Sequence, residues 1–178
     1  TATLLRAMSP RFTSNDAILR EFYESEVVET GDAKASAKLE GRIACGDVVD
    51  PNTGEVLIDS GAIINKTQAQ VLADASIGPI EVLKEAKDPL ILQSLQEDPT
   101  SDHESALLRI YQRLRPGNPP QLEKARELFH EKFFDTNRYR LGKVGRFRMN
   151  RKLKLNVPEN EMTLRPEDLI AAIRYLLK

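Results

Sequence analysis

The sequence predicts an α+β fold, in which a helical domain is interrupted by a small β-rich insertion. Residues 1–30 and 87–178 show apolar side chains at helical spacing and are assigned to the helical domain. Residues 31–86 contain short strand-like runs, turn sequences and one helical stretch, and are assigned to the insertion. At 178 residues and 40% hydrophobic composition, the chain can bury a core and is expected to hold one domain or two small ones.

In the first segment, residues 17–23 predict a helix because their apolar side chains recur on one face. Ser14 or Asn15 is the candidate N-cap, since both side chains can accept a hydrogen bond from the first turn. The small, polar stretch Gly31–Ser36 predicts a flexible loop.

Within the insertion, the sequence predicts a β-hairpin, a short helix and a further strand. Ile43–Val49 and Glu55–Ile58 are the predicted hairpin strands, and Asp50–Gly54 has the composition of the turn between them. Asn65 is the candidate cap of the short helix, and Ile80–Leu83 predicts the further strand. This part of the chain is acidic on balance.

Three helices are predicted in the C-terminal part of the chain. The first begins at Ser101 or Asp102 and ends before Arg115–Pro120, because proline suits a first helical turn but not a helix interior. The second follows this turn and runs to about Phe134. The third begins near Pro166, where acidic side chains favour the positive end of the helix dipole.

Positive charge is gathered in one segment of a chain whose net charge is only -1. Residues 137–154 contain eight Lys or Arg and no Asp or Glu. Residues 104–154 carry fourteen basic and five acidic side chains, whereas residues 1–103 carry nine basic and eighteen acidic ones. This separation of sign predicts a polyanionic partner for the basic part. Tyr139 and Phe147 lie within the run, and aromatic rings among cations favour nucleic acid over a bare membrane surface.

A run of charge is also typical of a solvated helix face, and composition alone does not separate the two interpretations. The run lacks acidic residues three or four positions away, which would add roughly 0.2–0.5 kcal/mol per pair to a merely soluble helix. The uncompensated cations therefore favour an outside anion, or an acidic neighbour elsewhere in the fold.

The sequence contains no pattern typical of a catalytic or metal site. His103 and His130 are far apart, and neither HExxH nor CxxC occurs. Cys45 is the only cysteine, so the chain has no internal disulfide, and it is expected to be a small buried hydrophobe in a reducing cytoplasm. No apolar stretch approaches the ~18 residues needed to span a bilayer. The start at Thr1 indicates an excised fragment.

A specific pattern of residues extends over the basic segment and the two predicted helices before it. The pattern consists of Ala106–Tyr111, Leu114–Pro120, Leu128-Phe129, Phe133-Phe134, Arg138-Tyr139, Leu141, Val144–Arg146 and Asn150–Leu153. It closely resembles the β subunit of bacterial DNA-dependent RNA polymerase. Thr3–Met8 is similar to the start of this segment in the family, and residues 50–57 with 67–83 resemble an insert that some bacterial β subunits carry. The resemblance is strongest over residues 104–154 and looser over 26–100.

The resemblance implies a fragment of the β lobe, one jaw of the polymerase over downstream and promoter DNA. The whole enzyme would be a nucleotidyltransferase that synthesises RNA on a DNA template, and this fragment would be non-catalytic. The fragment would hold no cofactor, since the magnesium ion of the family is held by aspartates of the β′ subunit. The implied partners are DNA, the β′, α and ω subunits and σ factor, without a membrane, in the bacterial cytoplasm at the nucleoid.

The family motif maps onto Arg146, Asn150 and Arg151, and this chain adds further cations nearby. The candidate DNA-binding residues are Arg138, Lys143, Arg146, Arg148, Asn150, Arg151 and Lys152. Their cations are expected to neutralise phosphates and release counterions, which would hold DNA without reading its bases.

The alternative is a protein-interaction module. In this interpretation, the basic face docks on acidic surfaces of σ factor or another subunit, or the acidic insertion docks regulators. A stand-alone enzyme is a third class, and no set of residues in the sequence supports it.

Overall fold

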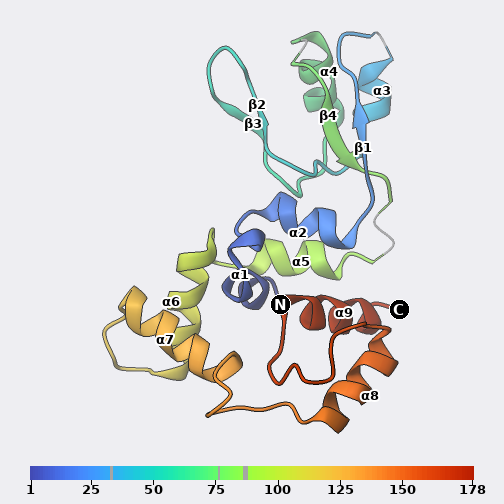
Figure 1. The fold of residues 1–178 in the computed structure, drawn as a ribbon. Coiled ribbons are helices and arrows are strands. Elements are labelled where there is room, and N and C mark those ends of the chain that lie inside the picture. The colour runs from blue at the N-terminus through green and yellow to red at the C-terminus, as the bar shows by residue number, and fades with distance from the viewer. Residues whose placement is uncertain (33, 76, 86–87) are drawn as a thin grey trace. The chain divides into compact units, whose positions relative to one another are not determined.

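The computed structural model describes residues 1–32, 34–75, 77–85 and 88–178, and its α+β fold confirms the predicted class (Figure 1). The chain divides into two compact units. The helical unit comprises residues 1, 3–13 and 99–178, and the β-rich unit comprises residues 2 and 14–98. The β-rich unit is therefore wider than the predicted insertion, 31–86, because strands and helices on both sides of that range belong to it.

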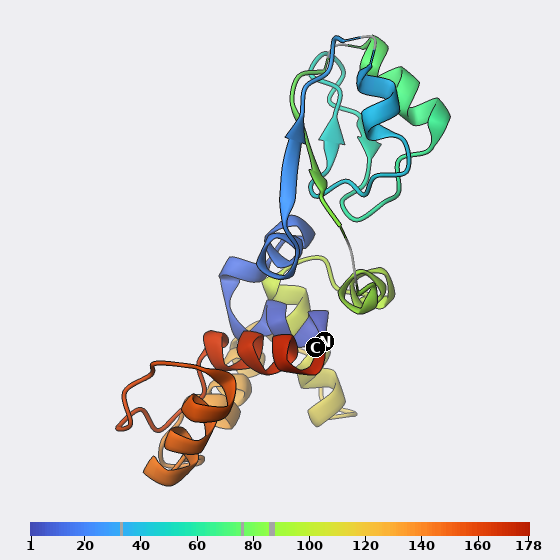
Figure 2. The ribbon, with the colours of Figure 1, turned by 90° about the vertical axis from the view of Figure 1, so that its right-hand side faces the viewer.

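The helical unit is built from helices and one 3-10 turn. These are α1 (Ala2–Met8), η1 (Pro10–Phe12), α6 (His103–Leu114), α7 (Leu122–Phe133), α8 (Lys143–Leu153) and α9 (Pro166–Leu176). The predicted helices correspond to α6, α7 and α9, whereas the basic run turns out to form the additional helix α8. Helix α8 lies beside α9 (Figures 1 and 2).

Helices α1, α6 and α7 bury their apolar faces together. The buried side chains of this core are Ala7, Met8, Ala106, Leu107, Tyr111, Ala125, Leu128 and Phe129. Helix α6 is capped by Asp102, whose carboxylate accepts a hydrogen bond from the backbone N–H of Ser105 at 2.7 Å. This hydrogen bond lowers the pKa of Asp102. Of the two predicted caps, the structure therefore selects Asp102.

The β-rich unit contains two small antiparallel sheets and four helices in its described residues. Its elements are α2 (Asn15–Phe22), β1 (Ser25–Val28), α3 (Ala35–Leu39), β2 (Val48–Val49), β3 (Val56–Ile58), α4 (Lys66–Asp74), β4 (Ile80–Leu83) and α5 (Leu90–Glu97). Strand β1 pairs with β4, and β2 pairs with β3. The core between these elements includes Leu39, Ile64, Leu72 and Val82.

The predicted hairpin is confirmed, with a shorter first strand than expected. Ile43 and Ala44 form isolated bridges to Ile63 and Val82 instead of continuing the pairing with β3. The predicted helix after Asn65 is also confirmed, since the Asn65 side chain accepts from the backbone N–H of Gln68 at 2.8 Å in a capping box. The predicted strand Ile80–Leu83 is β4.

Three elements of this unit were not predicted. Strand β1 and helix α5 lie outside the predicted insertion, and helix α3 adds a second helix within it. Helix α3 begins at Ala35, so it replaces the end of the predicted loop Gly31–Ser36, of which Ala33 lies outside the described residues. In the described ranges, no helix combines the length and the apolar character needed to cross a membrane.

Candidate nucleic-acid interface

Helix α8 carries most of the predicted DNA-binding residues, and the structure separates them into two groups. Lys143, Arg148, Arg151 and Lys152 are exposed, and Arg138 is exposed in the segment that precedes the helix. No ion pair to any of these five cations occurs within the described part of the chain. Lys152 instead has its ammonium group 5.1 Å from the centre of the Tyr175 ring. These five side chains are thus available to an outside anion.

Arg146 belongs to the second group and corrects the sequence-based assignment. Its side chain is 0% exposed and forms an ion pair with Asp168, with 2.7 Å between Arg146 Nη1 and Asp168 Oδ1. A phosphate cannot reach a guanidinium that is enclosed in this way. The predicted DNA contact of Arg146 is therefore wrong, because its partner is an internal carboxylate.

Asn150 also faces inward. It is half-buried, and its Nδ2 donates a hydrogen bond to the backbone carbonyl of Val157 at 2.7 Å. Arg146 and Asn150 are four residues apart and thus lie on the same face of α8. Of the residues that match the family motif, Arg146 and Asn150 therefore bind groups within the protein, whereas Arg151 is exposed.

The outer side of α8 also exposes apolar side chains among the cations. Val144 is 66% exposed and Phe147 is 50% exposed. Each is followed four residues later by an exposed arginine on the same side of the helix, Arg148 after Val144 and Arg151 after Phe147. An aromatic ring among cations is suited to contact with nucleic acid, as the sequence indicated.

The two histidines and the cysteine make contacts within the protein and form no catalytic or metal site among the described residues. His103 Nδ1 lies 2.6 Å from the backbone oxygen of Arg6, and the ring of His130 lies 6.1 Å from that of Phe134. Cys45 is buried as expected, and its burial raises the pKa of its thiol to about 11. In the residues that the structure covers, no group of three His, Cys, Asp or Glu side chains could hold a metal ion.

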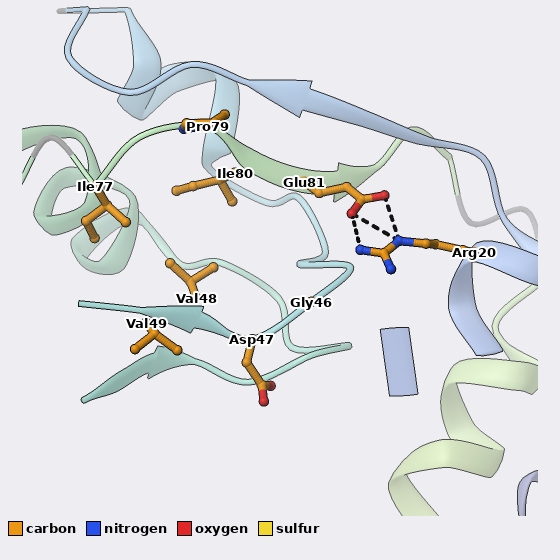
Figure 3. A pocket seen from close by; sticks show the side chains of 9 residues that line it. All are labelled: Arg20, Gly46, Asp47, Val48, Val49, Ile77, Pro79, Ile80 and Glu81. Carbon is orange, nitrogen blue, oxygen red and sulfur yellow. Dashed lines mark hydrogen bonds and ion pairs between the residues drawn. The ribbon is translucent and has the colours of Figure 1, made fainter. Parts of the chain in front are cut away.

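A cavity of about 330 Å³ lies in the β-rich unit (Figure 3). Its apolar lining is made by Val48, Val49, Ile77, Pro79 and Ile80. At one end, Arg20 Nη2 lies 2.6 Å from Glu81 Oε2, and this hydrogen-bonded pair lowers the pKa of Glu81. The lining offers apolar contact, one charged pair and the carboxylate of Asp47, which suits binding rather than catalysis.

Comparisons with known proteins identify the family. The sequence model of the family described as RNA polymerase Rpb2, domain 2 matches residues 82–178. The chain is 52% identical over 178 residues to the DNA-directed RNA polymerase subunit beta of Rhodopirellula baltica, covering 98% of this chain and 14% of that protein. It is 35% identical over 179 residues to the subunit of the same name from Protochlamydia amoebophila, again covering 98% of this chain and 14% of that protein.

The matched domain covers residues 82–178, which include helices α6 to α9, and it assigns this part of the chain to the class of Rpb2-type polymerase subunits. The whole-chain relatives narrow this class: the chain belongs to the family of bacterial DNA-directed RNA polymerase β subunits. The resemblance found in the sequence is thereby confirmed. The chain spans about 14% of the length of these relatives.

Proposed function

We propose that this chain is a DNA-clamping part of a β subunit of DNA-directed RNA polymerase. It contributes to RNA synthesis by holding DNA, and it supplies no catalytic residue of its own. The observation that carries this proposal is a group of exposed cations on α8 and just before it that form no ion pair with any described residue, namely Arg138, Lys143, Arg148, Arg151 and Lys152. Family membership adds the context of an enzyme that acts on DNA.

The mechanism follows from phosphate electrostatics. Exposed Arg and Lys side chains displace condensed counterions from the DNA backbone, and the released ions favour binding without any base readout. Arg148 and Arg151 can each present a planar fork to a phosphate. The magnesium ion of the whole enzyme is expected on the β′ subunit, and the expected partners are β′, α, ω and σ in the cytoplasm of a bacterium.

Changing Arg148 and Arg151 to glutamine tests this proposal in the assembled polymerase that contains the full β subunit. Each lost phosphate contact is expected to reduce the slope of log affinity against log salt by about 0.9. The dissociation of promoter DNA, measured over a series of salt concentrations, gives this slope. The double variant should also shorten the lifetime of the complex.

Arg126→Gln is the matched control. Arg126 is exposed on α7 in the same unit, but it pairs with Glu104 at 3.1 Å and with Glu123 at 3.2 Å. Its loss should leave the slope unchanged. A double variant of Arg148 and Arg151 with the same slope and lifetime as the unaltered enzyme would contradict the proposed role.

A second candidate function, protein docking, is favoured by the β-rich unit. Residues 14–98 carry seventeen acidic and seven basic side chains, and the cavity with its partly apolar lining belongs to this acidic unit. Val49 and Val56 form an exposed cross-strand pair, and Val49 also lines the cavity. Negative charge around apolar surface complements a basic, amphipathic segment of a protein partner, for which σ factor is the proposed source.

Replacing Val49 with glutamate tests the docking role. A charge at this exposed position would have to be buried when the partner binds and would disrupt apolar contact. The affinity of the polymerase for σ, measured by a fluorescence-anisotropy titration, should therefore fall at least several-fold. The matched control is Val27→Glu on β1, since Val27 is exposed outside the cavity lining. Equal σ affinity for the two variants and the unaltered enzyme would count against docking at this cavity.

A further inference from the structure

We propose that Arg146 and Asp168 form a latch that positions helix α8, so that its exposed cations face the DNA. This inference rests on the proposed DNA-clamping function and adds to it a positioning pair that does not itself touch DNA. The latch is defined here as the side chains of Arg146 and Asp168 together with the backbone groups that they bind.

The guanidinium of Arg146 is held on three sides. In addition to the ion pair with Asp168, Nη2 donates to the backbone carbonyl of Thr163 at 2.6 Å and Nε donates to that of Glu161 at 3.3 Å. A planar guanidinium can make these bonds at the same time only in one orientation. The connection between α8 and α9 is thereby bound directly to the inner face of α8.

Asp168 links this arrangement to the next helix. Its Oδ1 accepts from Arg146, while its Oδ2 accepts from the backbone N–H of Arg165 at 2.9 Å, at the start of α9. Asp168 is 2% exposed, so both oxygens are used inside the protein. One carboxylate therefore joins α8 to the first turn of α9, where a negative charge is favourable.

Other contacts of the helix depend on the same face. Arg146 is the buried residue of α8, while the apolar Val144 and Phe147 are exposed. Asn150 binds the carbonyl of Val157, one turn further along the latch face. Polar contacts, rather than an apolar stripe, thus determine which side of α8 is turned outward. Loss of the latch should let the helix rotate or shift away from the DNA.

The proposed latch and simple electrostatics predict opposite effects on DNA binding when the charge of Asp168 is removed. Asp168 is negative, so removing its charge should strengthen the binding of a polyanion if only Coulomb forces act. If Asp168 positions α8, the same change should weaken binding, because Arg148 and Arg151 lose their alignment. A substitution at Asp168 therefore separates positioning from charge.

The experiment compares Asp168→Asn with Glu167→Gln in the assembled polymerase. Glu167 is the neighbouring residue in the first turn of α9 and is exposed, so its variant removes the same charge without touching the latch. Asp168→Asn should shorten the lifetime of the promoter complex roughly tenfold, equivalent to ~1.4 kcal/mol. It should also speed amide hydrogen exchange over residues 143–153. Glu167→Gln should leave exchange unchanged and the lifetime equal or longer.

Arg146→Lys provides a second variant if the polymerase that carries Asp168→Asn fails to assemble. Lysine keeps the positive charge but cannot bind Asp168, Thr163 and Glu161 in one plane. Its complex should be shorter-lived although the net charge is the same, and exchange over α8 should again be faster.

An equal or longer lifetime for these latch variants overturns the inference. The double variant of Arg148 and Arg151 then separates the two possible failures. If that variant lowers the salt slope, the DNA-clamping function stands and the latch alone is wrong. If it leaves the slope unchanged, the DNA-clamping function is wrong as well.

Discussion

Replacing Arg146 with methionine is expected to lower the free energy of unfolding of the helical unit by about 3–5 kcal/mol. The substitution removes the cation and leaves the Asp168 carboxylate buried without its charged partner. It also leaves the carbonyls of Glu161 and Thr163 without the donors that they have in the native structure. Leaving a buried charge unpaired costs far more than the net strength of the pair, so the effect should be large.

Urea unfolding followed by far-ultraviolet circular dichroism would measure this loss, with Arg148→Met as the control. Arg148 is on the same helix but exposed, so its change should stay within about 0.5 kcal/mol. Similar unfolding midpoints for the two methionine variants would show that the internal ion pair contributes little to stability.

Replacing Phe129 with alanine is expected to destabilise the helical unit by about 3–5 kcal/mol, through loss of packing in the core of α1, α6 and α7. Phe129 is 5% exposed. The centre of its ring lies 4.6 Å from that of Phe133 and 6.1 Å from that of Phe134. Truncation therefore removes aromatic contacts and leaves a cavity that the surrounding helices can fill only in part.

The same substitution at Phe147 is the control for Phe129. Phe147 is 50% exposed on α8, so alanine there should change stability by less than about 1 kcal/mol. Denaturant unfolding of both variants would show the difference. Equal destabilisation would mean that the aromatic core of α7 is not packed as the structure shows.

The sequence predicted those elements whose signals are local. Asp102 and Asn65 cap α6 and α4 through side chains that bind backbone groups three residues away, so a short window contains the complete signal. Strand β1 was missed because it has only four residues, and its partner, β4, lies more than fifty residues further along the chain. A strand that short is defined by its pairing rather than by its own composition.

The candidate site was predicted only in part, because some of its contacts are local in sequence and others join distant residues. The cation run identified the segment, but a charge count gives every arginine equal weight and does not show which one turns inward. The partner of Arg146 is Asp168, which lies 22 positions away in another helix. The one local sign was the spacing of Arg146 and Asn150, four residues apart on the face that the structure turns inward.

The pairing of β1 with β4 brings together the two ends of a long stretch of chain. Ser25 is paired with Leu83 and Val28 with Ile80, and the backbone N–H of Lys84 donates to the carbonyl of Glu24 at 2.9 Å. The chain between them therefore starts at the end of β1 and returns at the start of β4, which is hydrogen-bonded to β1. The distance between these two strands stays the same however many residues connect them. Because loop-closure entropy grows only slowly with length, evolution can enlarge, trim or exchange that excursion while the ladder at its base stays the same.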